Sequence, residues 1–185
     1  MQTSETPENL LVQRAIANDR DAFANLYENN VARVSRYVYY CVHSQVDAED
    51  ITQEVFIRAW KAINRYSPRG VSFGAWLIAI AHNLIIDHFR AKKQVIPLDS
   101  VADTLPSNDK SPTALSEVNF DRIQVKQAVF KLAPDKQKVV VMRFVDGLSC
   151  AEVAQLLNKS EGAVRVIQHR ALKDLRRLMG QADGK

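Results

Sequence analysis

The chain has 185 residues, of which 46% are hydrophobic, and its 25 Lys and Arg against 21 Asp and Glu give a formal charge of +4. This length and composition are ordinary for a globular protein of one domain or two small ones. The most apolar run, Trp76 to Ile86, is interrupted by His82 and Asn83 and is too short to cross a bilayer. We therefore do not expect the chain to insert into a membrane.

The first residues and the two cysteines are typical of a cytoplasmic protein. Met1–Asn9 is polar and acidic, so no signal peptide is expected at this end. Cys41 and Cys150 are only two cysteines in apolar contexts, which does not make a disulfide framework. We therefore expect reduced, buried thiols in a cytoplasmic protein.

The charge is unevenly spread along the chain. Residues 1–95 carry 11 basic and 10 acidic side chains, for a net +1, and residues 96–121 carry 1 and 5, for a net −4. Residues 122–185 carry 13 and 6, for a net +7. A basic C-terminal third after a neutral-to-acidic remainder indicates that this third meets a polyanion.

The N-terminal half is expected to be helical throughout. Asp21 is a plausible N-cap of the second helix and Ser72 of the fourth. The third helix should end near Ser67, because the residue before a proline disfavours helical backbone. The expected helices cover about 8–18, 21–42, 47–66 and 72–93.

The C-terminal half begins with a segment of different character. Residues 97–112 contain three prolines with several Ser and Asp, which is typical of a linker. Helices resume at about 116–131, 135–145, 149–157 and 160–178. No strand alternation or internal repeat is visible. The expected fold class is all-α, with two small helical domains, 1–95 and 122–185, joined by a flexible acidic linker over 96–121.

The third predicted helix has an unusually wide apolar arc. Ile51, Val55 and Ala59 define a core stripe, while Phe56 and Trp60 form an i, i+4 pair to one side of it. Either this helix is buried on two sides, or its flank is a docking surface for another protein. Periodicity alone leaves both alternatives open.

The fourth predicted helix combines aromatic, polar and basic side chains. Aromatic rings beside cations suit single-stranded nucleic acid, because bases stack on rings while Lys and Arg hold phosphates. The alternative is that its aromatics, Phe73 and Trp76, simply belong to the core. The candidate single-strand residues are Phe73, Trp76, Asn83, Asp87, Arg90, Lys92 and Lys93.

Residues 149–178 predict two short helices joined by a tight turn. Ser149 and Glu152 have the spacing of a capping box, and Ser160 is a candidate N-cap of the second helix. That helix places cations opposite an apolar stripe, which is the geometry of a helix-turn-helix entering a DNA major groove. The alternative is an ordinary helical hairpin with a solvated charged face. The candidate DNA residues are Lys159, Ser160, Arg165, Gln168, His169, Arg170 and Lys173.

Two blocks of sequence carry a family resemblance. DAEDITQEVFIRAWKAI (47–63) followed by FGAWLIAIAHNLIIDHFRAKK (73–93) resembles region 2 of bacterial sigma-70 superfamily factors. LAPDKQKVVVMRFVDGLSCAEVAQLLNKSEGAVRVIQHRALKDLR (132–176) resembles their region 4. The order of the blocks, with a linker in place of a middle domain, is similar to the extracytoplasmic-function (ECF) group.

The resemblance implies a division of labour in region 2. The 47–63 helix would bind a coiled coil on the largest subunit (β′) of core RNA polymerase, and an apolar flank with adjacent carboxylates suits a basic partner helix. The 73–93 segment would melt the −10 element, with Asn83 and Asp87 near an extruded base and Arg90, Lys92 and Lys93 on phosphates. The matching polymerase-binding positions are Asp50, Gln53, Glu54, Phe56 and Trp60.

Region 4 would read the −35 element through Arg165, His169 and Arg170, since Arg is the best single reader of guanine. Lys159, Ser160 and the backbone at Glu161 and Gly162 would seat phosphates, and a side chain bulkier than glycine at 162 could obstruct them. A polar pair that is usual in the family is replaced here by Val166 and Ile167. We expect Ile167 to pack inward and Val166 to face a thymine methyl.

The remaining implications concern partners. The protein would direct promoter-specific initiation with core RNA polymerase (β′ and β subunits), and family analogy adds an anti-sigma factor. The linker carboxylates Asp99, Asp103 and Asp109 either imitate RNA or belong to a soluble tether. No enzyme activity, cofactor or small-molecule substrate is expected. No metal site is expected either, because Cys41-x-His43 lacks a second ligand pair at zinc-like spacing.

Two other functions compete with this interpretation. A stand-alone helix-turn-helix regulator would account for 132–178 but leaves the Phe56–Trp60 flank without a purpose. A decoy that occupies an anti-sigma factor would not need Arg165, His169 and Arg170.

Overall fold

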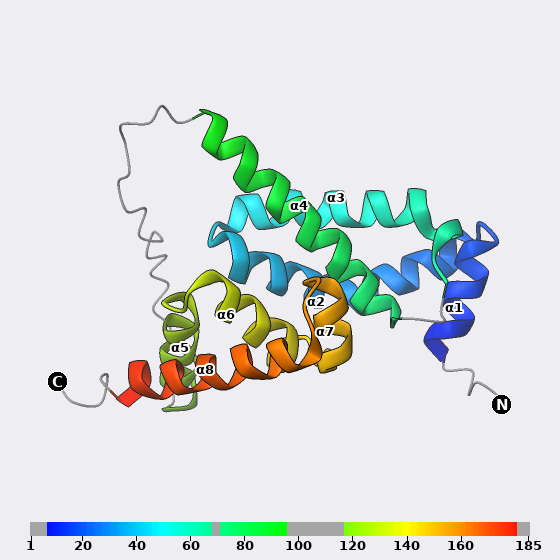
Figure 1. Cartoon of the computed structure of the whole chain (residues 1–185). Coiled ribbons are helices and arrows are strands. Elements are labelled where there is room, and N and C mark those ends of the chain that lie inside the picture. Colours follow the sequence, from blue (N-terminus) through cyan, green and yellow to red (C-terminus); the bar gives the residue numbers. More distant parts are fainter. Residues whose placement is uncertain (1–6, 68–70, 96–116, 181–185) are drawn as a thin grey trace. The chain divides into compact units, whose positions relative to one another are not determined.

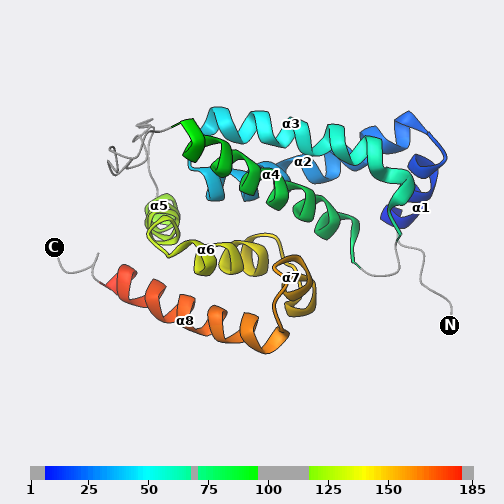
Figure 2. The ribbon, with the colours of Figure 1, turned by 45° about the horizontal axis from the view of Figure 1, so that its top comes forward.

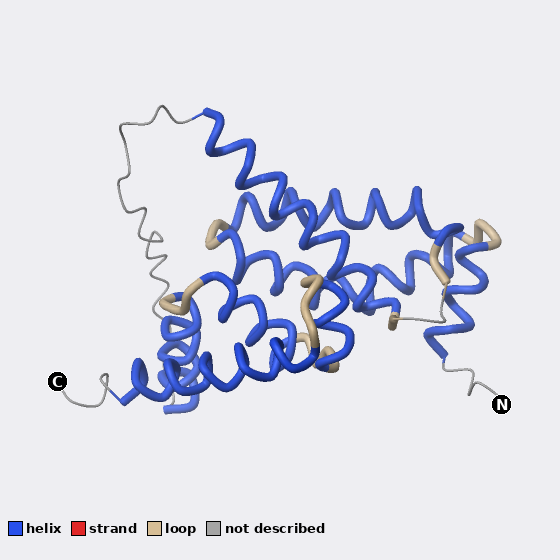
Figure 3. Tube along the Cα trace, in the orientation of Figure 1, coloured by secondary structure: helices blue, strands red, loops and turns tan. Residues whose placement is uncertain are grey.

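The computed structural model describes residues 7–67, 71–95 and 117–180, with side chains for all of these except 93–95 and 117–123. Within these ranges every regular element is a helix (Figure 3). The chain divides into two compact units, Met1–Ala102 and Asp103–Lys185. The expected all-α class with two domains is confirmed. Asp99, Asp103 and Asp109 lie outside the described residues.

The first unit is a bundle of four helices (Figure 1). The long helix α2 contacts all three of the others, and α3 also packs against α4. A 3₁₀ turn, η1, extends α3 at its C-terminal end, so the expected single helix to residue 66 is wrong in its last turn. The elements are α1 (Pro7–Ile16), α2 (Arg20–Val42), α3 (Gln45–Ala62), η1 (Ile63–Arg65) and α4 (Phe73–Val95).

Side-chain caps set where these helices begin. Asp19 caps α2 by accepting a hydrogen bond from the Ala22 N–H at 3.0 Å, so the expected cap Asp21 is wrong. Ser44 caps α3 by accepting from the Asp47 N–H at 3.3 Å, which starts the helix two residues before the expected position. Ser72 accepts from the Ala75 N–H at 3.3 Å, as expected for the cap of α4.

The core of the first unit lies where α2 meets α3 and α4. A polar pair joins two of these helices inside it, because the Tyr37 hydroxyl lies 3.1 Å from His82 Nδ1. Burying a hydroxyl and an imidazole is tolerable only when they are hydrogen-bonded, so this contact fixes α4 against α2 in a single register. The fully buried side chains of α2, α3 and α4 include Leu26, Val34, Val38, Val55, Leu77, Ile78 and Ile85.

The second unit places α8 against three other helices. Helix α8 packs on α5, α6 and α7, and α7 precedes it through a short turn (Figure 2). The buried residues of this unit include Val139, Met142, Leu148 and Val153, together with Val164 and Ala171 of α8. The elements are α5 (Glu117–Phe130), α6 (Pro134–Val140), η2 (Val141–Val145), α7 (Cys150–Leu156) and α8 (Glu161–Gly180).

The expected continuous helix over 135–145 changes character before it ends. Val141–Val145 (η2) is a π-helical turn in which the Asp146 N–H donates to the Val141 carbonyl at 3.0 Å. Gly147 follows with a φ of +67°, a left-handed conformation that glycine adopts without steric cost. The wider π turn inserts one residue into the helix and therefore redirects the side chains that follow it.

In the part of the chain that is described, none of the helices combines the length and apolar character that a membrane span requires.

Candidate nucleic-acid interface

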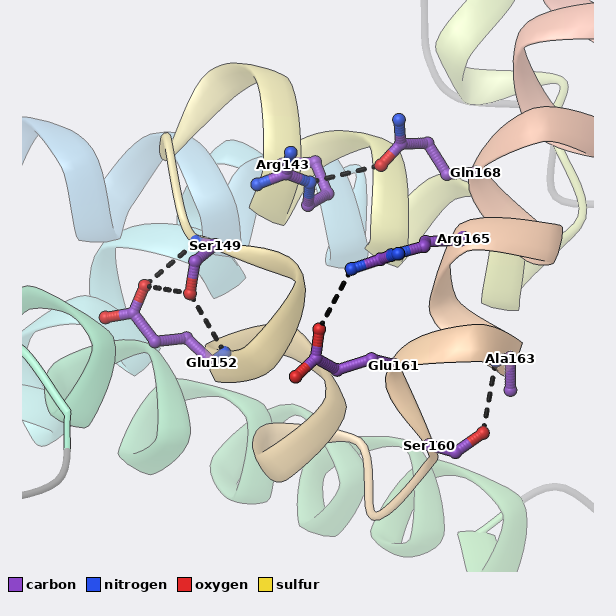
Figure 4. A network of polar contacts seen from close by, with 8 residues as sticks. All are labelled: Arg143, Ser149, Glu152, Ser160, Glu161, Ala163, Arg165 and Gln168. Carbon is purple, nitrogen blue, oxygen red and sulfur yellow. Dashed lines mark hydrogen bonds and ion pairs between the residues drawn. The ribbon is translucent and has the colours of Figure 1, made fainter.

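Caps hold the two helices of the C-terminal hairpin at their starts (Figure 4). Ser149 Oγ accepts from the Glu152 N–H at 3.1 Å while Glu152 Oε2 accepts from the Ser149 N–H at 2.9 Å. The predicted capping box is therefore present. Ser160 Oγ accepts from the Ala163 N–H at 3.1 Å and caps α8 as predicted. Asn158 has a φ of +50° in the turn, a conformation that Asn tolerates better than most residues.

Helix α8 has its buried residues and its cations on different sides. Val164 and Ala171 are fully buried, whereas the cationic side chains of the expected DNA-facing set are exposed. Arg165 forms an i, i+4 ion pair with Glu161 at 3.3 Å, a weak contact that leaves its guanidinium at the surface. On α8 the exposed members of the set are Arg165, His169, Arg170 and Lys173, and Lys159 and Ser160 are exposed just before the helix begins.

Val166 and Ile167, which depart from the family pattern, differ in exposure. Val166 is 49% exposed, while Ile167 is half-buried beside the apolar stripe. The inward packing of Ile167 is therefore only partial. A methyl-bearing side chain at position 166 stands among the exposed cations of α8, where it could meet an apolar group.

The backbone at the start of α8 has free space beside Gly162. A Cβ built on Gly162 would lie 3.9 Å from its nearest neighbour, Ser160 Oγ, so the packing of the free chain does not demand glycine there. Lys159 Nζ lies 3.8 Å from Asp135 Oδ2, so this cation is shared with an exposed carboxylate of α6. Its expected role on a phosphate would require it to exchange one anion for another.

Gln168 differs from its neighbours in the expected DNA-facing set. It is half-buried, and its Oε1 accepts a hydrogen bond from Arg143 Nε at 3.1 Å. The Arg143 guanidinium also donates through Nη1 to the Leu148 carbonyl, just before α7. Sequence reasoning missed Arg143, because its partners lie 5 and 25 residues away and its helix turn is of π type.

Helix α4 exposes one polar strip. Asn83, Asp87 and Arg90 are exposed and follow i, i+4, i+7 spacing, so they share a helix face. Arg90 Nη1 lies 3.7 Å from Asp87 Oδ1, and Trp76 is half-buried two turns before Asn83 on the same face. Phe89, which the sequence reasoning did not single out, is 43% exposed.

Phe73 belongs to the core and not to this surface. It is 2% exposed, and its ring centroid lies 5.6 Å from that of Tyr66 and 5.6 Å from that of Trp76. A ring enclosed by two others cannot stack on a base without unfolding the end of α4. The core alternative therefore holds for Phe73, and its expected contact with single-stranded DNA is wrong for this conformation.

The basic end of α4 is tied to the first turn of α3. Lys92 Nζ lies 2.9 Å from Asp47 Oδ2, and His88 Nε2 lies 3.5 Å from the same oxygen. The hydrogen bond from Lys92 is the main cause that lowers the pKa of Asp47 below its usual value, and partial burial opposes it. The side chain of Lys93 lies outside the described part of the chain.

Helix α3 buries one of its two aromatic residues and half-buries the other. Phe56 is 5% exposed and packs edge-on against Tyr27 of α2, with ring centroids 4.7 Å apart. Trp60 is half-buried and packs on Phe23 of α2 at 4.8 Å. The alternative of burial on two sides therefore holds for Phe56, whose ring is not available to a partner.

A different apolar pair is exposed on α3. Val46 is 69% exposed and Ile57 is 47% exposed. With the exposed Asp50 and Gln53 between them, they follow i, i+4, i+7, i+11 spacing and occupy one face. Glu54 lies beside this face and pairs with Arg58 at 2.7 Å. Sequence periodicity left open whether the Phe56–Trp60 flank is covered, because it cannot tell which apolar arc a neighbouring helix covers, and it did not single out Val46 and Ile57.

The described ranges contain no candidate metal site. No group of three or more His, Cys, Asp or Glu side chains there is arranged to hold a metal ion. Neither Cys41 nor Cys150 forms a disulfide, and Cys41 is buried while Cys150 is only half-buried.

Comparisons with known proteins match both units. Residues 26–95 match the family model for Sigma-70 region 2, and residues 128–177 match the model for Sigma-70, region 4. The chain is 39% identical over 171 residues to the ECF RNA polymerase sigma factor BldN of Streptomyces coelicolor, covering 91% of this chain and 64% of that relative. It is 34% identical over 176 residues to the ECF RNA polymerase sigma factor SigD of Mycobacterium tuberculosis, covering 90% and 81%.

The fold is also similar to a solved structure. The sigma factor RpoE of Bartonella quintana, solved in complex with the anti-sigma factor NepR, superposes with a TM-score of 0.73. The similarity covers 85% of this chain and 96% of that one at 19% sequence identity. At this identity the comparison supports the helical fold.

Proposed function

The chain belongs to the ECF group of sigma-70 RNA polymerase sigma factors, and from this premise we propose which of its surfaces hold polymerase and which hold promoter DNA. The observation that carries the proposal is the exposed cationic face of α8 in a unit that follows a region 2 unit. A promoter-reading helix alone would describe a regulator. Its combination with region 2 describes a protein that works on polymerase.

Helix α3 is the proposed surface for core polymerase. Its exposed face offers Val46 and Ile57 as apolar anchors, with Asp50, Gln53 and Glu54 on or beside that face. Apolar side chains flanked by carboxylates suit a helical partner that is apolar at its centre and basic at its rim. The β′ coiled coil is the proposed partner. Trp60, on the same helix, packs against Phe23 of α2 and so holds α3 in place beside α2.

Helix α4 is the proposed surface for the −10 element. Asn83 and Asp87 can hydrogen-bond the edge of an extruded base, Trp76 can supply a stacking wall, and Arg90 can pair with a phosphate. Lys92 and Lys93 extend the basic end, although Lys92 would have to leave Asp47 to reach DNA.

Helix α8 is the proposed reader of the −35 element. Arg165, His169 and Arg170 are exposed in its N-terminal half, the part of a recognition helix that contacts bases. Lys159, Ser160 and Lys173 would hold the phosphates on either side, and Val166 would contact a thymine methyl. The open backbone at Gly162 supports a close approach of the DNA strand.

The wider setting follows from the family. The protein would act in the cytoplasm with the β′ and β subunits of core polymerase, and it is an initiation factor that does no chemistry itself. An anti-sigma factor is a further proposed partner, supported by the relative solved with one. Such a partner would have to cover the exposed faces of α3 or α8 in order to inhibit.

Run-off transcription with purified core polymerase tests the proposal. Addition of this chain should produce a transcript of fixed length from a promoter that carries its −35 and −10 elements, and none when either element is scrambled. A stand-alone regulator would instead bind duplex DNA by itself, typically as a dimer on half-sites one helical turn apart, and would start no transcript.

A further inference from the structure

Arg143 connects the start of the helix-turn-helix to its recognition helix (Figure 4). Its Nη1 donates to the Leu148 carbonyl, and its Nε donates to Gln168 Oε1 at 3.1 Å. Building on the proposed reading of the −35 element by α8, we propose that Arg143 and Gln168 form a positioning pair. In this pair Gln168 is a strut that orients α8 and does not itself read a base.

The chemistry of the pair fixes which way the Gln168 amide faces. An arginine side chain has only donors, so the atom that meets Arg143 Nε must be the amide oxygen. The amide nitrogen of Gln168 then points away from Arg143 (Figure 4). Glutamine reads adenine with its oxygen and nitrogen together. The hydrogen bond to Arg143 directs the amide oxygen of Gln168 toward a half-buried guanidinium, so the side chain would have to give up this orientation to make that two-bond contact with a base.

The position of Gln168 explains why such a strut matters. On α8 it lies between the buried residues Val164 and Ala171 and the exposed Arg165 and His169. Apolar packing is non-directional, so the buried stripe alone tolerates small rotations of the helix. A hydrogen bond from a charged donor is directional and about twice as strong as a neutral one. The pair therefore fixes the roll of α8, and with it the aim of Arg165 one turn away.

The π turn accounts for the reach of Arg143. Val141–Val145 inserts an extra residue before the chain turns at Gly147. Arg143 is the central residue of η2 and is half-buried. From there one guanidinium contacts both the segment before α7 and the side of α8, so both helices of the motif share one anchor.

The test compares discrimination, not activity. The full chain is combined with core polymerase, and initiation is measured on two promoters that differ only in the −35 element, one cognate and one scrambled. The ratio of the two rates is the readout, because a variant that only lowers the amount of folded protein reduces both rates equally. The thermal midpoint of each variant is recorded alongside.

Gln168→Glu separates a strut from a reader. A carboxylate accepts from Arg143 at least as well as an amide, but it has no N–H to offer a base. The strut predicts that Gln168→Glu keeps the wild-type ratio, even though its added negative charge weakens binding to both promoters. Gln168→Met, which can accept nothing comparable, should lower the ratio about threefold or more, within the range of measured pairwise couplings.

Arg143→Met supplies the second half of the test. It should lower the ratio as far as Gln168→Met does, and the double variant should be no worse than the poorer single one. A ratio that Gln168→Glu lowers as much as Gln168→Met would overturn the proposal in favour of direct base reading. So would an unchanged ratio in a folded Arg143→Met. If Arg143→Met does not fold, the two Gln168 variants alone decide.

Failure of the proposed function would look different. In that case the wild-type chain would show no preference for the cognate promoter at all.

Discussion

Lys92 Nζ lies 2.9 Å from Asp47 Oδ2 and thereby ties the basic end of α4 to the first turn of α3. The contact joins two helices with different proposed tasks, DNA melting and polymerase binding. It also sets a competition, since a DNA phosphate approaching Lys92 must replace the Asp47 carboxylate.

The Asp47–Lys92 pair should stabilise the fold only while Asp47 is ionised. The pKa of Asp47 is lowered in the folded chain, so its contribution is complete above the unfolded-state pKa and is lost as the pH falls through the folded-state value. A double-mutant cycle of Asp47→Asn and Lys92→Gln, followed by urea unfolding, should show a coupling of up to about 1 kcal/mol at neutral pH. The coupling should vanish once the pH lies below the folded-state pKa of Asp47. A coupling that persists there would assign it to something other than charge.

Phe56 and Ile57 are neighbours in sequence but should respond to mutation in opposite ways. Phe56→Ala should cost about 3–5 kcal/mol of unfolding free energy, because the ring is buried against Tyr27. Ile57→Ala, at a side chain that is 47% exposed, should change stability by less than about 0.5 kcal/mol and weaken binding to core polymerase.

The measurement pairs chemical denaturation with a titration against labelled core enzyme, at concentrations where every variant is folded. Val125→Ala, at an exposed apolar residue of the other unit, is the matched control. Unchanged core affinity in both Ile57→Ala and Val46→Ala would remove α3 as the docking face proposed here.

Asn83→Ala should impair promoter opening more than binding to closed duplex. Its amide is exposed on α4 and has no base to meet until one leaves the stack. Permanganate reactivity of unpaired thymines reports opening, and a gel shift at low temperature reports closed binding. Arg90→Ala is the comparison, since loss of a phosphate contact should weaken both and reduce the salt dependence. Equal losses in the two assays for Asn83→Ala would exclude the extruded-base role.

Arg165→Ala should cost about 1–3 kcal/mol on the cognate −35 element and much less on promoters that lack it, if the guanidinium reads a base. Arg177→Ala, at an exposed position near the C-terminal end of the same helix, removes the same charge and serves as the control. Transcription from matched promoter pairs measures both. A uniform loss for Arg165→Ala on all promoters would make it a phosphate contact.

Local sequence rules predicted the parts of this fold that are decided locally. The Ser149–Glu152 capping box and the Ser160 and Ser72 caps involve residues three apart, and each is present as expected. The separation of cationic from buried residues on α8 follows from helix periodicity alone. These features required no knowledge of what lies across from them.

The errors arose where a partner distant in sequence decides the outcome. Phe56 and Phe73 were assigned to surfaces, but Tyr27 and Tyr66 cover them, and periodicity cannot reveal a cover. For the same reason the sequence did not single out Ile57, which is 47% exposed. Arg143 was overlooked because its role depends on Gln168, 25 residues away.

Selection from random DNA tests the central claim most directly. Core polymerase loaded with the full chain is allowed to transcribe a library of random upstream sequences, and the sequences that yield transcripts are read. Two conserved blocks at constant spacing from each other and from the start site are expected, with the upstream block altered by Arg165→Ala and the downstream block by Asn83→Ala. A single block, or start sites no different from those of core polymerase alone, would contradict the account.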